Sequence, residues 1–325
     1  MNKVEKGFTF KHSILVYVCL FLGMAFFGSG TPAAKIVTAR FPLFMAPFLR
    51  LLAAALLTTP LLIVHRKRLR GISKGNWLLI LGIGAIGLVA FSIFLLTGMR
   101  MVNGVVGAMV MSISPAVVAL GAAWFLGDHL GWRKITAVFF AVSGVLIINV
   151  WGKSIQAAGW TLPLGSLLVF GAVCSATAYS LFAKKASRDV KPVLLVPLAA
   201  WVATVFFAIP GIYQAAGFDF AKPSFNEWFA LIWWGIGPFA VGTSLWFMGL
   251  ESVKASIASG FMGAMPASGL VLSYVWLGDA FHWIHLLGFV FVLASIGIVV
   301  WTHWIKEREM QRKQKKHEGH ILCPC

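Results

Sequence analysis

Long apolar runs separated by short polar segments dominate the chain. A helix needs about 20 predominantly apolar residues to cross the hydrocarbon core of a bilayer, and ten such runs can be placed here. They cover residues 13–33, 42–64, 77–97, 102–126, 133–151, 162–183, 192–213, 227–248, 253–277 and 283–304. Ten helices of this length take up about 200 residues, which leaves no room for a soluble catalytic domain. The sequence therefore predicts an all-α integral membrane protein with ten transmembrane helices.

The first apolar run is compatible with two interpretations. Lys3, Lys6 and Lys11 precede it, and a signal peptide would also begin with cations followed by an apolar stretch. The run, however, continues through a small-residue segment, 28–34, without a polar break. We therefore expect a cytoplasmic N-terminus, residues 1–12, followed by a first helix that is not cleaved.

Composition and charge agree with a membrane protein. Hydrophobic residues make up 59% of the chain, charged residues only 11%, and the mean hydropathy is +0.87, which excludes ordinary soluble enzymes and disordered proteins. With ten spans and a cytoplasmic N-terminus, 21 of the 27 Lys and Arg residues fall on the cytoplasmic side, as the positive-inside rule requires. The net charge of +17 thus reflects topology and indicates no nucleic-acid partner.

A sequence pattern recurs at a constant offset of 151 residues. Met111, Pro115, the triplet 126–128 (Leu-Gly-Asp) and Trp132 return as Met262, Pro266, the triplet 277–279 and Trp283. The offset spans five predicted helices, an odd number, so the two halves cross the membrane in opposite directions. Inverted repeats of this kind are a transporter architecture. We expect repeats over residues 13–152 and 160–305 and a basic cytoplasmic tail over residues 306–325.

These features resemble the EamA-type branch of the drug/metabolite transporter superfamily, over about residues 13–305. The marks are two five-helix halves, a Gly-Ser-Gly-Thr-Pro segment at 28–32 followed by Lys35, and Arg50 in the second span. The fourth and ninth spans each carry a proline and end in Leu-Gly-Asp, where the family usually has Leu-Gly-Glu. No counterpart of Arg50 stands in the second half, where the chain reads Pro-Leu-Ala-Ala-Trp at 197–201. The resemblance implies a metabolite transporter and leaves its substrate open.

Arg50 is the one strongly charged side chain that the sequence places well inside a predicted span. A cation there is costly and marks a candidate functional site, which would bind a substrate carboxylate or phosphate. The alternative is a structural role, with the side chain reaching an interface or bonding backbone carbonyls. No Asp or Glu falls in the middle of a predicted span, so we expect transport without a proton gradient and an anionic or zwitterionic substrate.

Small polar and aromatic residues inside the spans are candidates for the cavity lining. They are Ser29, Thr31, Ser92, Thr97, Ser175, Thr177, Tyr179, Thr243, Ser244 and Trp246, besides Arg50. The alternative for each is a simple hydrogen bond within or between helices. Residues Trp201, Trp233 and Trp234 also lie deep in the spans, where they either pack or stack on a flat substrate.

Hinges and gates are predicted from backbone-altering and terminal charged residues. Hinge candidates are Gly28, Gly30, Pro32, Pro115 and Pro266. The segment 28–32 is expected to be a broken or flexible part of the first helix, and Ser112 and Ser114 are expected to satisfy carbonyls that Pro115 frees. Gate candidates are Asp128 and Asp279, at the ends of their spans. Static kinks and polar helix-end anchors are the respective alternatives.

The inverted repeats predict a secondary transporter that moves a small organic solute across the inner (plasma) membrane by alternating access. The family resemblance implies that the solute is a metabolite, an amino acid or a related zwitterion or anion, and that it is exported. The sequence predicts no enzyme activity, no cofactor and no metal site; a metal site formed by the tail residues His317, His320, Cys323 and Cys325 is the weaker alternative. The expected partners are the small-molecule substrate and the lipid bilayer, and the oligomeric state is open. The competing functions are a multidrug exporter of lipophilic cations and a non-transporting receptor.

Overall fold

The computed structural model describes residues 10–126, 161–186, 189–250 and 264–281, with isolated residues between 132 and 143 and between 261 and 301. All regular structure in these described ranges is helical. The first half contains α1 (Phe10–Arg40), α2 (Met45–Val64), α3 (Arg66–Leu69), α4 (Lys74–Gly82), the π-helix η1 (Ile83–Ala90), α5 (Phe91–Met101), α6 (Gly104–Met111) and α7 (Ser114–Leu126). The second half contains α10 (Thr161–Ala186), α11 (Pro192–Ala216), α12 (Phe225–Gly235), the π-helix η2 (Ile236–Gly242), α13 (Thr243–Leu250) and α15 (Ala264–Leu277).

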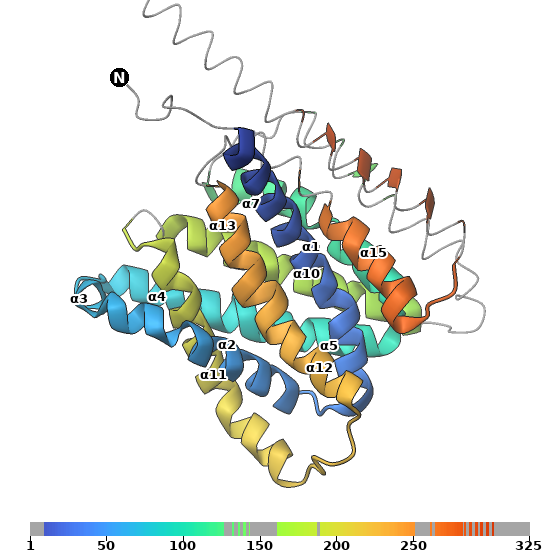
Figure 1. The fold of residues 1–325 in the computed structure, drawn as a ribbon, viewed down its shortest axis with the longest axis horizontal. Coiled ribbons are helices and arrows are strands. Elements are labelled where there is room, and N and C mark those ends of the chain that lie inside the picture. The colour runs from blue at the N-terminus through green and yellow to red at the C-terminus, as the bar shows by residue number, and fades with distance from the viewer. Residues whose placement is uncertain are drawn as a thin grey trace, which may run out of the picture.

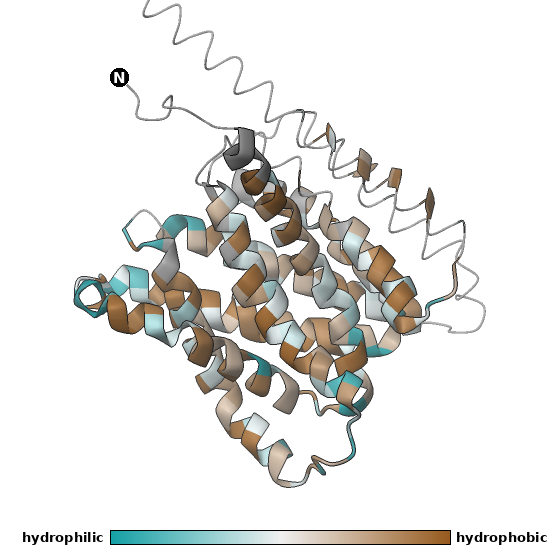
Figure 2. Ribbon diagram, viewed as in Figure 1, coloured by the Kyte–Doolittle hydropathy of each residue, from teal (hydrophilic) through white to brown (hydrophobic). Residues whose placement is uncertain are grey.

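Five helical segments in the described part are long and apolar enough to cross a membrane. They are Leu15–Arg40, Met45–Val64, Lys74–Met101, Thr161–Ala186 and Leu194–Ala216, and each overlaps one of the predicted spans. Hydrophilic residues gather at the ends of the helices, for example at α3, whereas hydrophobic residues follow their lengths (Figure 2). The predicted spans 133–151 and 283–304, Asp128 and the tail 306–325 lie largely or wholly outside the described residues.

The helices place small side chains inside and large apolar side chains outside. On α11, Ala199, Ala200 and Ala203 are fully buried, whereas Val205 and Ile209 are 68% and 84% exposed. Soluble proteins rarely expose such continuous apolar faces, and helices in membranes approach one another through small residues. The outer surface of α11 is therefore suited to contact lipid.

The two halves exchange equivalent contacts. The first long helix of the first half, α1, packs against α12, η2 and α13, while its counterpart α10 packs against α4, η1 and α5. In Figure 1, α1 (dark blue) runs beside the orange α12 and α13. The second helices of the two halves, α2 and α11, pack against each other. This exchange is what a two-fold relation between the halves produces.

The repeat extends into the π-helices, which the sequence analysis did not predict. Gly84 lies in η1, and Gly235, 151 residues later, is the last residue of α12, directly before η2. A side chain at Gly84 would collide with Val202 of α11, and one at Gly235 would collide with the Arg50 backbone of α2. Both glycines therefore allow a helix of the opposite half to approach closely.

The expectation that the segment 28–32 breaks the first helix is wrong, because α1 is helical throughout and includes Pro32. Gly28 instead faces the backbone of α15, where an added Cβ would stand 2.1 Å from the Met265 carbonyl oxygen, and Gly30 faces Pro238. The two glycines serve close packing of α1 against the second half. Their role as hinges stays a prediction.

The helix interruption near Pro115 follows the expected chemistry. The helix ends at Met111 and resumes at Ser114, which puts Pro115 in the first turn of α7. The hydroxyl of Ser114 donates to the Met111 carbonyl at 2.5 Å, and that of Ser112 donates to the Ala108 carbonyl at 2.6 Å. Because proline removes the donor that the Met111 carbonyl would otherwise meet, the predicted compensation is confirmed for Ser114. The Ala108 carbonyl already accepts the backbone N–H of Ser112 and is not one that Pro115 frees. Pro266 lies in the first turn of α15.

Candidate functional site

Arg50 lies on the inner face of α2 and is only 6% exposed. It occupies the space between three helices of different parts of the chain, namely α2, the η1–α5 helix and α12. Gly235 at the end of α12 lets the backbone of α2 come close, because a Cβ there would stand 2.8 Å from the Arg50 carbonyl oxygen. The guanidinium is thus held deep within the bundle by close helix packing.

The polar contacts of the Arg50 side chain are few and neutral. Its Nη2 donates to the Ser92 hydroxyl at 3.0 Å, and its Cζ lies 3.8 Å from the ring centroid of Trp234. Nε is buried and has no hydrogen-bond partner among the described residues. Within that part of the chain no carboxylate forms an ion pair with Arg50. The site therefore holds a positive charge that the described protein does not neutralise.

Ser92 is itself held in place by the π-helix. Its hydroxyl donates to the Leu88 carbonyl at 2.7 Å, inside η1, so its lone pairs are turned to Arg50. Trp234 is 2% exposed and comes from the last turn of α12. A cation over the face of a desolvated tryptophan is stabilised by roughly 2 kcal/mol. Both contacts orient the guanidinium and leave its charge unbalanced.

This arrangement is suited to bind an anion. A guanidinium presents donors in a planar fork that matches a carboxylate or phosphate, and a buried hydrogen bond between charged groups is stronger than one between neutral groups. A buried charge without a counter-charge destabilises the protein that carries it. A carboxylate bound at this position would neutralise the charge of Arg50 and remove that cost in free energy.

Trp233, the neighbour of Trp234, connects the site to α1. Its Nε1 donates to the Ser29 hydroxyl at 2.8 Å, and its ring stacks on Phe26 with centroids 5.2 Å apart. Ser29 also donates to the Phe26 carbonyl at 2.6 Å. Thr31, two residues further along α1, is buried. Of the two predicted cavity residues of α1, Ser29 is therefore hydrogen-bonded, and it adjoins the Arg50 site through the two tryptophans.

The predicted cavity residues of α10 do not join this site. The hydroxyls of Ser175 and Thr177 each donate at 3.0 Å to the carbonyl four residues back, on Gly171 and Val173. Tyr179 packs on Gly87 of η1. These bonds satisfy the hydroxyls within their own helix, which favours the structural interpretation of Ser175 and Thr177.

The remaining cavity candidates are dispersed. Trp246 packs against Val16 and Leu20 of α1, while Thr97 and Thr243 are half-buried. The side chain of Ser244 lies outside the described part. Of the predicted lining residues, the structure brings Arg50 and Ser92 into contact. Trp234 completes the site, although no sequence feature distinguishes it from the other deep tryptophans.

A second polar group stands at one end of the bundle. Lys35 Nζ donates to the carbonyls of Met99 and Val102 at 2.7 and 2.5 Å, where α5 ends. The Asp279 carboxylate accepts the backbone N–H of Val105 at 3.0 Å, at the start of α6. Both bonds satisfy groups that a helix end leaves free, and the Asp279 bond links the two halves. The other gate candidate, Asp128, lies outside the described residues.

No set of three or more His, Cys, Asp or Glu side chains among the described residues is close enough to hold a metal ion. The His and Cys residues of the tail, 317–325, lie outside that part of the chain. Around Arg50, the described interior presents one cation, a hydroxyl and an aromatic ring.

Comparison with known proteins identifies relatives over nearly the whole chain. The sequence profile of the EamA-like transporter family matches residues 14–150 and 163–301, one copy for each half. "Uncharacterized transporter YetK" of Bacillus subtilis (strain 168) is 25% identical over 298 residues, covering 92% of this chain and 90% of that protein. The "Probable terminal-alkyne amino-acid exporter" of Streptantibioticus cattleyicolor is 26% identical over 218 residues, covering 66% of this chain and 70% of that protein. A solved crystal structure shares the fold, with a TM-score of 0.58 at 15% identity over 88% of this chain and 94% of its own.

Proposed function

We propose, because the chain belongs to the EamA-like transporter family, that it exports a small organic metabolite with a carboxylate group, an amino acid or a related zwitterion or anion. The observation that carries this proposal is Arg50, a buried guanidinium whose described contacts are a hydroxyl and an aromatic face. A substrate carboxylate would supply the missing negative charge. Membership of a transporter family favours a non-enzymatic role.

The architecture we propose has ten transmembrane helices in two inverted five-helix repeats that rock against each other. The exchange of contacts between α1 and α10 and the third helices of the opposite halves supports a two-fold relation. Transporters with inverted repeats bind substrate between the halves. Arg50 belongs to the first half and Trp234 to the second, so their contact spans the interface that would open and close.

We place both termini in the cytoplasm of a cell whose inner (plasma) membrane holds the protein, because this orientation puts 21 of the 27 Lys and Arg residues on the cytoplasmic side. Lys35 and Asp279 then lie at the outer end. The bond of Asp279 to Val105, together with the 3.2 Å ion pair between Arg40 and Glu227, links the two halves at this end. Asp279 is therefore a gate residue in this proposal, and outward opening requires its bond to break.

Export of an amino acid or similar solute is supported by one relative, which is named as an amino-acid exporter. Its identity to this chain is 26%, so the name supports a class of solute and a direction, and no particular compound. A carrier of lipophilic cations would be expected to present carboxylates to its substrate. The described residues around Arg50 present a cation instead.

Metabolite profiles of cells and medium test the proposed function. We compare a deletion strain, a strain that overproduces the protein and a strain that overproduces Arg50→Met at the same level in the membrane. A carboxylate-bearing solute should accumulate inside the deletion strain and outside the overproducing strain, and Arg50→Met should restore the deletion profile. A response confined to lipophilic cations, or no solute that shifts oppositely in the two strains, would contradict the proposal.

A further inference from the structure

The described surface carries a cavity of about 480 Å³ at the junction of two helix connections. One wall is formed by the α3–α4 connection and the other by the α10–α11 connection. The residues that line it are Arg68, Gly71, Ile72, Ser73, Asn76, Asp189, Val190, Lys191 and Leu194. This cavity lies apart from the Arg50 site and is not explained by the proposed transport function.

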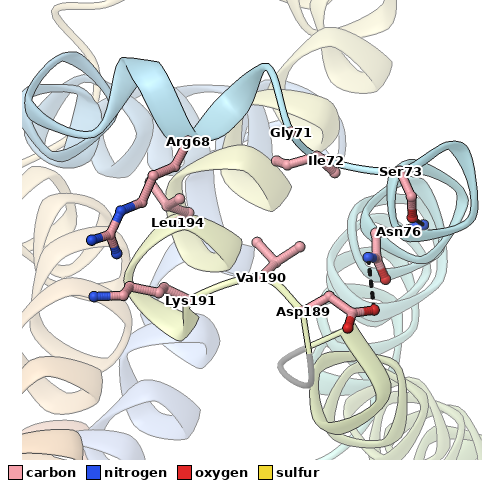
Figure 3. Close-up of a pocket in the computed structure, with 9 residues that line it drawn as sticks. All are labelled: Arg68, Gly71, Ile72, Ser73, Asn76, Asp189, Val190, Lys191 and Leu194. Carbon is pink, nitrogen blue, oxygen red and sulfur yellow. Dashed lines mark hydrogen bonds between the residues drawn. The ribbon is translucent and has the colours of Figure 1, made fainter.

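Two cations of the cavity lack an acidic partner in the described structure. Arg68 and Lys191 are exposed, extend to the same side of the cavity and form no ion pair there (Figure 3). The lining carboxylate, Asp189, lies at the opposite side and accepts a hydrogen bond from the Asn76 amide at 3.1 Å. The cavity is therefore polarised, with its positive charge at one side.

The backbone adds to this positive charge. Ser73 is the N-cap of α4 and Lys191 is the N-cap of α11, so two helices begin at the wall of the same cavity. The helix dipole places partial positive charge at each of these N-termini, which attracts anions. Ile72, Val190 and Leu194 provide an apolar floor between the charged groups. An anion with an apolar attachment matches this combination.

The repeat-related position in the second half, at the α11–α12 connection, has acidic partners for its cations. We call this position and that of the cavity the two corners of the repeat. At the 151-residue offset, Ser224 and Glu227 of α12 correspond to Ser73 and Asn76, and Asp219 corresponds to Arg68. In that corner Glu227 pairs with Arg40 at 3.2 Å and Asp219 pairs with Lys222 at 4.0 Å. Each cation there has an acidic partner. In the first corner Asn76 and Arg68 stand in place of both acids, and the remaining carboxylate, Asp189, bonds to Asn76 and forms no ion pair with Arg68 or Lys191 in the described structure.

The space itself also differs between the two corners. In the second corner Phe41 packs against Phe218 and Trp228, with ring centroids 5.7 and 5.0 Å apart. Phe41, Phe218 and Trp228 are the chain neighbours of Arg40, Asp219 and Glu227, so the rings pack together beside these charges. The repeat thus provides the same backbone corner twice, once filled by aromatic rings and balanced charges and once hollow and basic.

We infer that the hollow corner binds the phosphate group of an anionic phospholipid, with the glycerol backbone over the apolar floor. The neighbouring lipid-facing surface supports a lipid as the source of the phosphate, because Val64 at the end of α2 and Leu78 on α4 are 77% and 71% exposed. Basic pockets between transmembrane helices are suited to anionic headgroups. Arg68 and Lys191 bind the phosphate oxygens in this site.

Lipid titration of the purified full chain tests this inference. The protein is placed in phosphatidylcholine nanodiscs, phosphatidylglycerol is added in steps, and its binding is followed by the shift of the unfolding temperature. The test variant is Arg68→Gln/Lys191→Gln; the matched control is Arg66→Gln/Lys67→Gln, which removes two charges from the same short helix outside the cavity lining. Both pairs are exposed, so neither variant removes buried packing.

We expect the Arg68→Gln/Lys191→Gln variant to need about 30-fold more phosphatidylglycerol for half of the shift, and the control to behave within about three-fold of the wild type. An equal loss in both variants would show non-specific attraction and overturn the inference. A shift with millimolar inorganic phosphate alone that equals the lipid shift would identify a free phosphate as ligand and overturn the assignment to lipid. Transport of the solute does not enter the readout, so this test stands or fails independently of the proposed function.

Discussion

Arg50 and Lys35 are two cations inside apolar helices, and they differ in their hydrogen-bond partners. Lys35 donates to two backbone carbonyls at the end of α5, whereas Arg50 has one hydroxyl partner, an aromatic face and a buried Nε with no partner in the described structure. A hydrogen bond to a charged group stabilises a protein by about 1.5–3 kcal/mol. Capping the end of α5 is therefore enough to explain the position of Lys35.

The difference separates a cation with a structural role, Lys35, from the cation that we propose to bind the substrate, Arg50. Lys35 satisfies carbonyls that the end of α5 would leave free, and so it contributes to folding. Arg50 costs free energy where it stands, since a charge at the centre of a membrane helix is disfavoured by about 3 kcal/mol. A cation that destabilises the fold and is oriented by Ser92 and Trp234 fits the proposed role in substrate binding. Variants of Arg50, of its neighbours and of Lys35 test this contrast.

The largest effect is expected for Arg50→Met. Loss of one partner of a buried charged pair costs about 2–5 kcal/mol of binding, so export should fall at least about 30-fold. The unfolding temperature should stay equal or rise, because the change removes an uncompensated charge. Arg50→Lys, which keeps the charge and loses the planar fork, should recover part of the export. Efflux from loaded proteoliposomes and thermal unfolding measure both quantities; a destabilised Arg50→Met protein with normal efflux per folded molecule would place Arg50 beside Lys35 as a structural residue.

Trp234→Phe comes next. A smaller ring keeps the packing position but weakens the interaction with the cation, so we expect the KM for the solute to rise about ten-fold. Trp233→Phe is the matched control, because the Trp233 indole donates to Ser29, whereas Arg50 lies over the ring of Trp234. The KM values are compared in the same proteoliposome assay. Equal KM values for the two variants would remove Trp234 from the site.

Ser92→Ala removes the hydroxyl that orients Arg50. One lost hydrogen bond of this kind is worth about 1 kcal/mol, which predicts an increase in KM of about five-fold. Thr243→Ala is its repeat-related control, since Thr243 stands 151 residues later and its half of the chain has no arginine at the position of Arg50. We expect that variant to stay within about two-fold of the wild type. A larger change for Thr243 than for Ser92 would contradict the asymmetry of the two halves.

Lys35→Met should reverse the pattern of Arg50→Met. We expect the free energy of unfolding to fall by about 2 kcal/mol, since two carbonyls lose a charged donor, while the KM for the solute changes less than about two-fold. Denaturant titration and the efflux assay provide the two numbers. A raised KM with unchanged stability would make Lys35 a binding residue and break the comparison.

The smallest effect is expected for an imposed pH gradient. No Asp or Glu is among the buried side chains of the described residues, so the Arg50 site has no carboxylate there to carry a proton. Uptake of the solute into proteoliposomes at zero membrane potential should change less than about two-fold when a pH gradient is imposed. A steep rise would show proton coupling through a group outside this site.

The sequence predicted much of the fold because bilayer physics leaves few choices. Runs of about 20 apolar residues predicted the long helices, and the sequence pattern that recurs after 151 residues indicated the repeat. Local hydrogen-bond chemistry was also predictable, as Ser114 shows beside Pro115. The segment 28–32 was misjudged, because glycines that permit close packing and glycines that break a helix look alike in a sequence.

The candidate site was predictable only in part. Arg50 stood out because a charge in an apolar run is rare, and Ser92 was among many small polar candidates. Trp234 could not be selected, because its contact with Arg50 joins helices far apart in the chain and depends on the close approach that Gly235 allows. The sequence analysis identified no signal for the two π-helices, η1, which orients Ser92, and η2, which begins just after Trp234 and Gly235.

The most direct test of the central claim is ligand-induced stabilisation of the purified protein by the solute that the metabolite profiles identify. The shift in unfolding temperature is measured for the wild type and Arg50→Met, with the solute and with its methyl ester, which lacks the carboxylate charge. We predict a concentration-dependent shift for the wild type with the free carboxylate and none in the other three combinations. Equal shifts in the wild type and Arg50→Met would contradict the account, because the solute would then bind without the charge of Arg50.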